Sequence, residues 1–354
     1  MHYLDLTSKE KRDMSESYYK ALWYQNFSDK SVKCELCNHY CRILPSKTGR
    51  CGVRINKDGT LYSLVANRLI AQHIDPIEKK PFYHFHPISK SYSISTMGCN
   101  MSCIYCQNFE ISQVPKNETS EIKGHKVEPA KIVHEAKSAN CKSISYTYTE
   151  PTIFFETFLE TARLAKDLGI KNCLVTNGYI SEKALQDVAP YIDAANVDLK
   201  AYSDGFYIKV CGGRLGPVLE NIKTMIKLGI WVEVTTLLVP TLNDSPEEIE
   251  KIALFLLNIN SDIPWHLCRF QPNYQMKNLP TTPIKVIRQS RKIGLKSGLK
   301  YVYSGNVPGD PGENTYCPKC GQMVIERFGY TIHHYKIKDS KCMICSTPIA
   351  GVGM

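Results

Sequence analysis

Apolar runs rich in β-branched residues alternate with amphipathic stretches through the middle of the chain. The apolar runs predict buried strands over 92–96, 143–147, 172–176, 193–198, 231–238, 264–269 and 300–303. The amphipathic stretches predict helices over 129–140, 152–168, 181–190, 215–228, 246–258 and 284–297. Six repeats of a strand followed by a helix indicate a parallel sheet with right-handed crossovers. We therefore predict an α/β fold whose sheet curls into a partial (β/α)6 TIM-like barrel.

The two ends of the chain show different patterns. Residues 8–25 mix charged and aromatic side chains and predict an amphipathic helix that packs on the main domain. Residues 52–62 predict a hairpin whose turn is Asp58-Gly59. Residues 323–335 alternate in the manner of a second hairpin, after a Gly/Pro-rich stretch at 305–312 that reads as a linker.

These patterns divide the chain into three predicted parts. They are an N-terminal helix with a metal-binding segment at 1–80, the partial barrel at 81–304 and a small module at 313–354. Because a linker precedes the last part, removal of the residues after Gly312 is expected to spare the barrel.

The composition is that of a folded chain. It has 354 residues, of which 43% are hydrophobic, and a formal net charge of +10. It shows no basic segment followed by an apolar run at its start and no apolar stretch near the ~20 residues of a membrane span. We therefore expect a soluble, cytoplasmic protein without a membrane partner. The basic excess is a weak argument for nucleic acid, and no stacked aromatic–basic pattern supports it, so a nucleic-acid partner is not expected.

Fifteen cysteines indicate metal binding, because a disulfide scaffold would be a smaller, secreted chain. Eleven fall into three clusters: Cys34, Cys37, Cys41 and Cys51; Cys99, Cys103 and Cys106; Cys317, Cys320, Cys342 and Cys345. The first set has the spacing C-x2-C-x3-C-x9-C, for which Zn²⁺ and an auxiliary iron–sulfur cluster both fit. The last set forms two C-x2-C knuckles and predicts a zinc ribbon, with rubredoxin-type iron as the alternative. Isolated Cys141, Cys173 and Cys268 border apolar segments and read as core residues.

The central set follows a predicted strand directly, with the spacing C-x3-C-x2-C. A loop of this kind can place three thiolates on three corners of a [4Fe–4S] cluster. The fourth iron is then open to a small molecule that chelates it. The alternative is a three-cysteine part of a zinc site or of an ordinary ferredoxin, which the strand before the loop and the strand–helix repeats after it disfavour.

Polar residues follow the predicted strands at one end. They are Glu150 within Tyr148-Thr149-Glu150-Pro151, Asn177 after the third strand, Asp198 and Lys200 at the fourth, Val239 after the fifth and His266 in the sixth. Each is weak evidence alone, because strand-end turns and exposed ion pairs are common. Together they lie where barrel enzymes carry their chemistry, at the carboxyl ends of the strands.

With these residues in view, the chain resembles the radical S-adenosylmethionine (SAM) enzymes of the pyruvate formate-lyase activating type. More specifically, it resembles the radical SAM protein of the AmmeMemoRadiSam system. The resemblance is carried by these segments: Cys34 to Cys41, Lys79 to Pro87, Gly98 to Asn108, Tyr148 to Pro151, Asn196 to Lys200 and Cys317 to Gly321.

The resemblance implies a role for each site residue. Cys99, Cys103 and Cys106 would hold the [4Fe–4S] cluster, whose open iron takes the amino and carboxylate groups of SAM. The resemblance implies that Tyr105 contacts the adenine of SAM and that Val239 contacts the adenine edge through its backbone. Glu150 would bind the amino group, and Lys200, with Asp198 in the same motif, would bind the carboxylate. Asn177 would contact the ribose or carboxylate, and His266 the ribose or the substrate. One departure stands out, since the two glycines of the usual Gly-Gly-Glu motif are here Tyr148 and Thr149.

The implied activity is reductive cleavage of SAM to a 5′-deoxyadenosyl radical, which abstracts hydrogen from a protein or small-molecule substrate. The implied partners are an electron donor such as flavodoxin or ferredoxin and proteins of the Memo and AMMECR types. An RNA-modifying or RNA-binding iron–sulfur or zinc protein is the alternative from another class. A non-enzymatic iron–sulfur scaffold is a third possibility, which Glu150 and Lys200 disfavour because a scaffold needs no SAM-chelating set.

Overall fold

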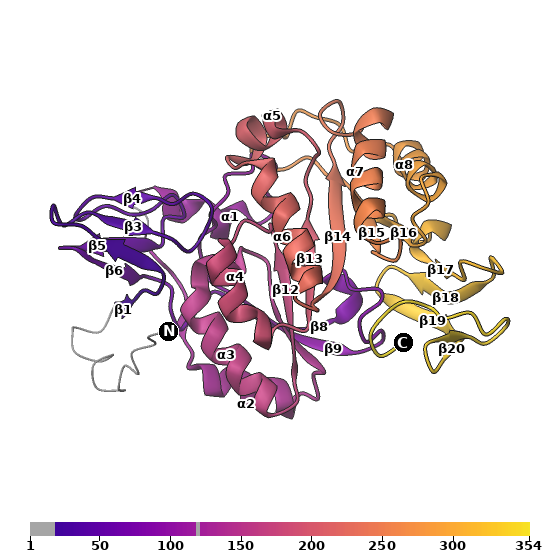
Figure 1. Ribbon diagram of the computed structural model, residues 1–354, viewed down its shortest axis with the longest axis horizontal. Helices are drawn as coiled ribbons and strands as arrows, with labels where there is room; N and C mark the ends of the chain where they lie inside the picture. The colour runs from indigo at the N-terminus through magenta and orange to yellow at the C-terminus, as the bar shows by residue number, and fades with distance from the viewer. Residues whose placement is uncertain (1–17, 118–120) are drawn as a thin grey trace.

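The computed structural model describes residues 18–117 and 121–354, and an eight-stranded sheet lies at its centre (Figure 1). In spatial order the strands are β16 (Val302–Gly305), β15 (Trp265–Arg269), β14 (Trp231–Leu238), β13 (Ala194–Asp198), β12 (Lys171–Thr176), β11 (Ser143–Tyr146), β9 (Lys90–Ser95) and β8 (Ala71–Pro76). All neighbours pair in parallel except β8 and β9, which are antiparallel. All seven predicted strands are therefore confirmed, and β8 adds an eighth.

Six long helices connect the parallel strands. They are α2 (Pro129–Ser138), α3 (Phe155–Asp167), α4 (Glu182–Val188), α6 (Leu215–Lys227), α7 (Pro246–Ile259) and α8 (Ile284–Lys296). Each falls within two or three residues of a predicted helix. Ser245 caps α7 by accepting a hydrogen bond from the Glu248 amide, and Pro246 occupies the first helical position.

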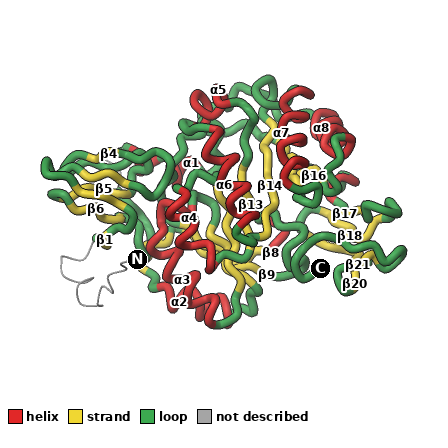
Figure 2. The backbone as a smooth tube through the Cα atoms, in the orientation of Figure 1, coloured by secondary structure: helices red, strands yellow, loops and turns green. Residues whose placement is uncertain are grey.

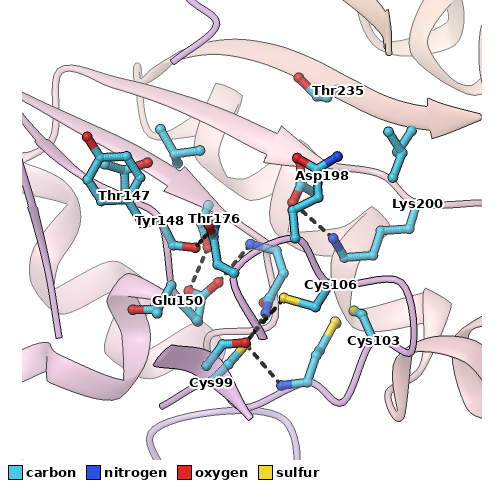
Figure 3. A pocket seen from close by; sticks show the side chains of 18 of the residues that line it. Cys99, Cys103, Cys106, Thr147, Tyr148, Glu150, Thr176, Asp198, Lys200 and Thr235 are labelled. Carbon is cyan, nitrogen blue, oxygen red and sulfur yellow. Dashed lines mark hydrogen bonds and ion pairs between the residues drawn. The ribbon is translucent and has the colours of Figure 1, made fainter. Parts of the chain in front are cut away.

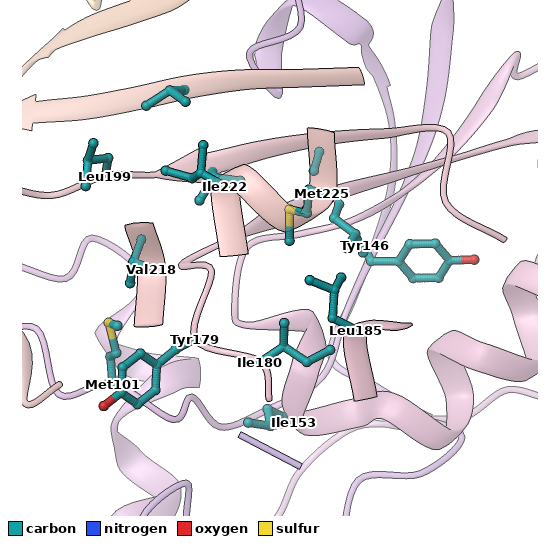
Figure 4. Close-up of a cluster of buried hydrophobic side chains, with 14 of the residues drawn as sticks. Met101, Tyr146, Ile153, Tyr179, Ile180, Leu185, Leu199, Val218, Ile222 and Met225 are labelled. Atoms are coloured by element: carbon teal, nitrogen blue, oxygen red, sulfur yellow. The ribbon is translucent and has the colours of Figure 1, made fainter. Parts of the chain in front are cut away.

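The sheet remains open within the described residues. β16 and β8 are its two edges, and no hydrogen-bonded ladder joins them. Helices and sheet pack through one continuous apolar layer, in which α6 contributes Val218, Ile222 and Met225, at the spacing of one helix face (Figure 4). The architecture is thus an open α/β sheet of partial-barrel type. Helices cover this sheet, as Figure 2 shows.

The N-terminal part corrects one prediction. Residues 18–25 are not helical: β1 (Tyr19–Lys20) pairs with β6 (Thr60–Ser63), and β2 (Tyr24–Asn26) pairs with β3 (Val32–Cys34). Residues 8–17 of the predicted helix lie outside the described residues. Trp23 adopts a positive φ of 58°, which a helix does not allow, so the strand pairings outweigh the helical pattern.

The hairpin predicted at Asp58-Gly59 is present. β5 (Arg54–Lys57) pairs with β6, and both turn residues have positive φ, as a two-residue hairpin loop of this hand requires. The other short elements are β4 (Arg42–Ile43), β7 (Arg68–Leu69), β10 (His125–Lys126), α1 (Phe109–Ser112), α5 (Asp204–Phe206), the π-helical turn Tyr207–Cys211 and the 3-10 turns Ile77–Lys79, Val114–Lys116, Pro151–Phe154, Ala189–Tyr191 and Pro311–Glu313.

The C-terminal part forms the predicted hairpin but is not a detached module. Its strands are β17 (Thr315–Tyr316), β18 (Met323–Phe328), β19 (Thr331–Tyr335), β20 (Ile337–Lys338) and β21 (Lys341–Cys342). Arg327 is buried, donates to the Tyr83 carbonyl and lies 4.2 Å from the centre of the Tyr83 ring. The Val352 amide donates to the His84 carbonyl, and the His86 amide donates to the Val352 carbonyl. The predicted linker therefore leads into a segment that is packed firmly on the sheet.

Within the part of the chain that the structure describes, no helix combines the length and apolar character that crossing a membrane requires.

Candidate functional site

A cavity of about 480 Å³ opens at the carboxyl ends of the parallel strands (Figure 3). The predicted site residues that line it are Cys99, Cys103, Tyr105, Cys106, Glu150, Asn177, Asp198 and Lys200. These residues come from the loop after β9 and from the ends of β11, β12 and β13. The strand-end constellation expected from the sequence is thus assembled around one space, with the three central cysteines on one of its walls.

The loop from Gly98 to Asn108, here called the hub loop, is fixed by close backbone contacts. Gly98 has a φ of +100°, and a β-carbon there would lie 2.7 Å from a methyl group of Val53. The Ser102 amide donates to the Cys211 carbonyl at 2.7 Å, and the Ile104 amide donates to the Val210 carbonyl at 3.0 Å. The loop is therefore clamped between the N-terminal part and the π-helical turn, which leaves its sulfurs facing the cavity.

The hub sulfurs are spread more widely than the ligands of a single ion. Side chains that share one metal ion must bring their ligand atoms close together. Among the described residues, the four C-terminal cysteines do so, with all their sulfurs within 4.8 Å of one another. Cys99, Cys103 and Cys106 form no such group. A cubane does not require such close sulfurs, because each of its thiolates binds a different iron.

The surroundings of the hub loop favour the thiolate form of Cys103. The Cys211 thiol hydrogen-bonds to Cys103 and lowers the pKa of Cys103, and the Lys200 ammonium acts in the same direction. Burial instead raises the pKa of Cys99 and of Cys106. Cys211, which the sequence left without a role, is therefore a close neighbour of the hub.

Glu150 is buried and holds two strand-end loops together. One carboxylate oxygen accepts hydrogen bonds from the Thr152 amide at 3.1 Å, the Thr152 hydroxyl at 2.6 Å and the Thr176 hydroxyl at 2.8 Å. The other accepts from the Asn177 amide at 2.8 Å. Burial nevertheless raises the pKa of Glu150, so a cation that enters the cavity would stabilise its charged form.

Lys200 supplies positive charge on the opposite side of the cavity. Its ammonium lies 2.9 Å from Asp198, and only 12% of its side chain is exposed. Burial lowers the pKa of Lys200, but Asp198 and the neighbouring thiols of Cys103 and Cys211 outweigh that effect and hold it well above its ordinary value. The cavity therefore carries a carboxylate at one wall and a stable ammonium at another (Figure 3).

The two residues that stand in place of the expected glycines are held by hydrogen bonds of their side chains. Tyr148 adopts a φ of +62°, a left-handed conformation that glycine adopts without strain. Its hydroxyl donates to Asp75, and its carbonyl accepts from the Asn108 side chain at 2.7 Å. Thr149 is fixed by hydrogen bonds of its side chain to Ser95 and to the Thr96 carbonyl. Hydrogen bonds therefore hold the backbone at both positions.

Two predicted contact residues lie outside the cavity lining. The Val239 amide donates to the Asn243 side chain at 2.6 Å, and the Val239 carbonyl accepts from the Leu242 and Asn243 amides. His266 is buried with its Nε2 atom 2.7 Å from Glu233. Tyr83 and Tyr303 pack on the His266 ring, so this side chain belongs to the interior of the sheet.

Several lining residues had no assigned role from the sequence. Lys79, Lys80 and Asn108 line the cavity, and so does Cys268. Cys268 was predicted to be a core residue, but it is only half-buried. Lys80 is buried beside Asp75, with 2.5 Å between the charged atoms. The Lys79-Lys80-Pro81 segment was visible as a charged pair before an aromatic run, but nothing local indicated that it would fold back to this cavity. Cys141 and Cys173 are buried, as predicted.

The cysteines within each four-cysteine set also gather at one place in the structure. In the C-terminal set, the sulfurs of Cys317 and Cys345 are 3.5 Å apart and those of Cys320 and Cys342 are 3.9 Å apart. Sulfurs that share one tetrahedral zinc lie about 3.8 Å apart, so this set fits a single ion. The cysteines of the N-terminal set all line a second, enclosed cavity: Cys34, Cys37, Cys41 and Cys51.

Comparisons with known proteins find the following similarities. The family model described as the radical SAM superfamily matches residues 93–256. The uncharacterized protein MJ0808 of Methanocaldococcus jannaschii is 42% identical over 333 residues, which cover 93% of this chain and 98% of that protein. The pyruvate formate-lyase-activating enzyme of Clostridium pasteurianum is 25% identical over 166 residues, which cover 46% of this chain and 68% of that enzyme. Among solved structures, SuiB of Streptococcus suis bound to S-adenosylmethionine is similar with a TM-score of 0.48 and 16% identity, covering 65% of this chain and 53% of that chain.

Proposed function

Because this chain belongs to the radical SAM superfamily, we propose that its strand-end cavity binds a [4Fe–4S] cluster and SAM in an activating-enzyme-like reaction. Cys99, Cys103 and Cys106 hold the cluster through three irons. When bound, the cluster and SAM supply a 5′-deoxyadenosyl radical that removes hydrogen from a substrate. The observation that carries the proposal is the meeting of the three hub sulfurs, Glu150 and Lys200 around one cavity.

The charged walls of the cavity orient SAM. Glu150 accepts a hydrogen bond from its ammonium group, and Lys200 donates to its carboxylate, while Asp198 keeps Lys200 protonated. Asn177 lines the same cavity, with its amide donating to Glu150 and its side chain donating to Asn100 at 2.7 Å. Tyr105 lines the same space from the hub loop and provides an aromatic face for the adenine. We leave Val239 and His266 out of this set, because other protein groups occupy their polar atoms.

The substrate is a protein or a small molecule that reaches the open mouth of the cavity. The similarity to a pyruvate formate-lyase-activating enzyme supports a protein substrate and a separate reductant. We propose flavodoxin or ferredoxin as the type of electron donor and proteins of the Memo and AMMECR types as partners. The C-terminal cysteines bind one Zn²⁺, which the sulfur separations support.

SAM cleavage tests the proposal directly. Reconstituted protein is incubated anaerobically with SAM and dithionite, and 5′-deoxyadenosine is measured by mass spectrometry. Cys103→Ala is expected to abolish the product, because the cubane loses one of its three protein ligands. Cys141→Ala is the matched control, since Cys141 is a buried cysteine outside the cavity lining. Equal product from wild type and Cys103→Ala would contradict the assignment. Adding each candidate partner and searching the mixture by mass spectrometry for modified protein then identifies the substrate.

A further inference from the structure

The N-terminal cysteines enclose a cavity that is separate from the one at the strand ends. Cys34 lies at the end of β3, Cys37 and Cys41 in the following loop and Cys51 in the turn before β5. All four line this cavity, together with Arg54 and Asn100. Cys34 and Cys51 are buried, and none of the four lines the strand-end cavity. The sequence left zinc and an iron–sulfur cluster as equal candidates for this set.

The spacing of the sulfurs distinguishes between them. Zinc–sulfur bonds of about 2.3 Å in a tetrahedron bring all four sulfurs to about 3.8 Å from one another. The C-terminal set meets this requirement. In the described residues, no three of the N-terminal sulfurs do, since they form no group whose ligand atoms all lie within 4.8 Å. They share this property with the hub cysteines, and they surround an enclosed space. A cubane has the first of these features, because each thiolate binds its own iron.

A buried arginine at the cavity provides an independent observation. Arg54 is only 1% exposed, yet its Nε and Nη1 atoms have no hydrogen-bond partner among the described residues. Its Nη2 atom donates to Glu156 at 3.0 Å and to the Leu22 carbonyl. Buried N–H groups of a guanidinium need acceptors, because leaving them unpaired is costly. The sulfides and thiolates of an anionic cluster are acceptors of this kind, and the cavity that Arg54 lines is where they would lie.

We propose that Cys34, Cys37, Cys41 and Cys51 hold a second [4Fe–4S] cluster, with Arg54 donating hydrogen bonds to it. Because each iron has a cysteine ligand, no iron is open to SAM or to a substrate. Such a closed cluster suits electron transfer or structural support rather than chemistry on a ligand. The proposal does not depend on SAM cleavage at the hub, since the two cysteine sets line different cavities.

The second site is in direct contact with the hub loop. His39, between Cys37 and Cys41, lies with its Nε2 atom 2.7 Å from the carbonyl of Asn100, the neighbour of Cys99. On the other side, Gly52 packs so closely on Pro115 that a β-carbon would lie 2.3 Å from the proline carbonyl oxygen. The two cysteine sets are therefore held by adjoining backbone segments. This arrangement gives electrons a short hydrogen-bonded route between them.

Iron content decides the proposal. The full chain is purified without oxygen and reconstituted with iron and sulfide. Iron, sulfide and zinc are then counted, and the dithionite-reduced protein is examined by electron paramagnetic resonance with and without SAM. Wild type should hold about eight iron atoms, four for each cubane. The variant Cys99→Ala/Cys103→Ala/Cys106→Ala should keep about four, in a cluster whose spectrum SAM does not change. Cys141→Ala should match wild type.

The hub-less triple variant keeps the N-terminal set intact, so a folding defect at that set cannot obscure the result. If this variant contains no iron and a second zinc per chain, the proposal is overturned. The complementary variant Cys37→Ala/Cys51→Ala should hold about four iron atoms in a SAM-sensitive cluster. In the hub-less background, Arg54→Lys keeps the positive charge beside Glu156 but removes donors, so the midpoint potential should fall. An unchanged potential would remove Arg54 from the cluster's surroundings.

Discussion

The two four-cysteine sets at opposite ends of the molecule have the same number of thiolates but different geometry. The C-terminal sulfurs lie within 4.8 Å of one another, whereas the burial of the cysteines is the same in both sets, with two buried and two half-buried. The N-terminal sulfurs are spread around an enclosed cavity beside a buried arginine. Each set begins with a C-x2-C knuckle, so short-range spacing does not distinguish them. The longer connections and the surrounding packing set the separation of the sulfurs, which is short enough for one shared ion only in the C-terminal set.

The largest effect is expected from removing the C-terminal set with its whole segment. A chain that stops after Gly312 loses Arg327 and exposes the apolar cluster around Tyr83, Tyr301 and Tyr303. Loss of soluble folded protein is therefore expected, in place of the spared barrel that the linker pattern predicted. Cys342→Ala in the full chain is the control, because it removes one metal ligand and keeps the packed strands. Circular dichroism and size-exclusion chromatography measure the outcome, and a folded 1–312 chain would restore the idea of a detachable module.

The next effect concerns the buried arginine of the N-terminal set. Arg54→Met leaves Glu156 charged and unpaired in the interior, so the free energy of unfolding should fall by about 3–5 kcal/mol. Arg54→Met/Glu156→Leu should recover most of that loss, because it removes both charges. Lys30→Met breaks an exposed ion pair with Asp58 and should change stability by about 1 kcal/mol or less. Denaturant unfolding under reducing, anaerobic conditions compares the three. An equal loss in the single and double variants would show that packing of the arginine stem, and not its charge, stabilises this region.

Glu150→Gln and Lys200→Met test the strand-end cavity separately from both four-cysteine sets. Charge-assisted hydrogen bonds contribute about 1.5–3 kcal/mol, so each change should weaken SAM binding about tenfold to a hundredfold. Iron and zinc contents should stay at wild-type values, because neither residue belongs to a cysteine set. Titration of SAM into the reconstituted variants measures the affinity. Glu150 also joins the Thr152 and Asn177 segments, so Thr152→Val, which removes one of its internal donors, controls for loop disorder. Wild-type affinity in both charge variants would leave the two walls without a role in SAM binding.

The smallest effect is expected from zinc removal. A thiol-reactive reagent used at limiting concentration should release metal from the half-buried Cys320 and Cys345 of the C-terminal set. The cluster absorbance of the hub should remain, since the cavity lining contains no cysteine from the C-terminal set. Simultaneous loss of zinc and of cluster absorbance would show that the ends of the molecule are coupled.

Much of the fold could be predicted because its strands and helices repeat with clear periods. The three hub cysteines could be placed in one loop for a similar reason, since their spacing is local, and all three line the strand-end cavity. Features that depend on distant contacts were missed. The strand pairing of Tyr19 and Tyr24 replaced a predicted helix, and the burial of Arg327 tied down a module expected to be free.

The same limit applies to individual site residues. His266 and Val239 follow or lie in strands as the pattern requires, yet Glu233 and Asn243 already occupy their polar atoms. Strand-end position indicates which residues are near a barrel mouth, but it does not reveal which way a side chain turns. The distances between sulfurs within a cysteine set also depend on the folded structure, so the spacing along the sequence does not reveal them.

Tyr148 has a consequence for how relatives of this chain are sought. A left-handed backbone conformation costs a non-glycine residue about 1–2 kcal/mol. Tyr148 adopts this conformation, and its ring hydroxyl donates a hydrogen bond to the buried carboxylate of Asp75. In this chain a tethered aromatic ring holds the left-handed torsion, which a glycine would adopt without strain. A search pattern that insists on glycine before Glu150 would discard chains that satisfy the same torsion. A pattern that allows an aromatic residue there, paired with an upstream aspartate such as Asp75, would retain them.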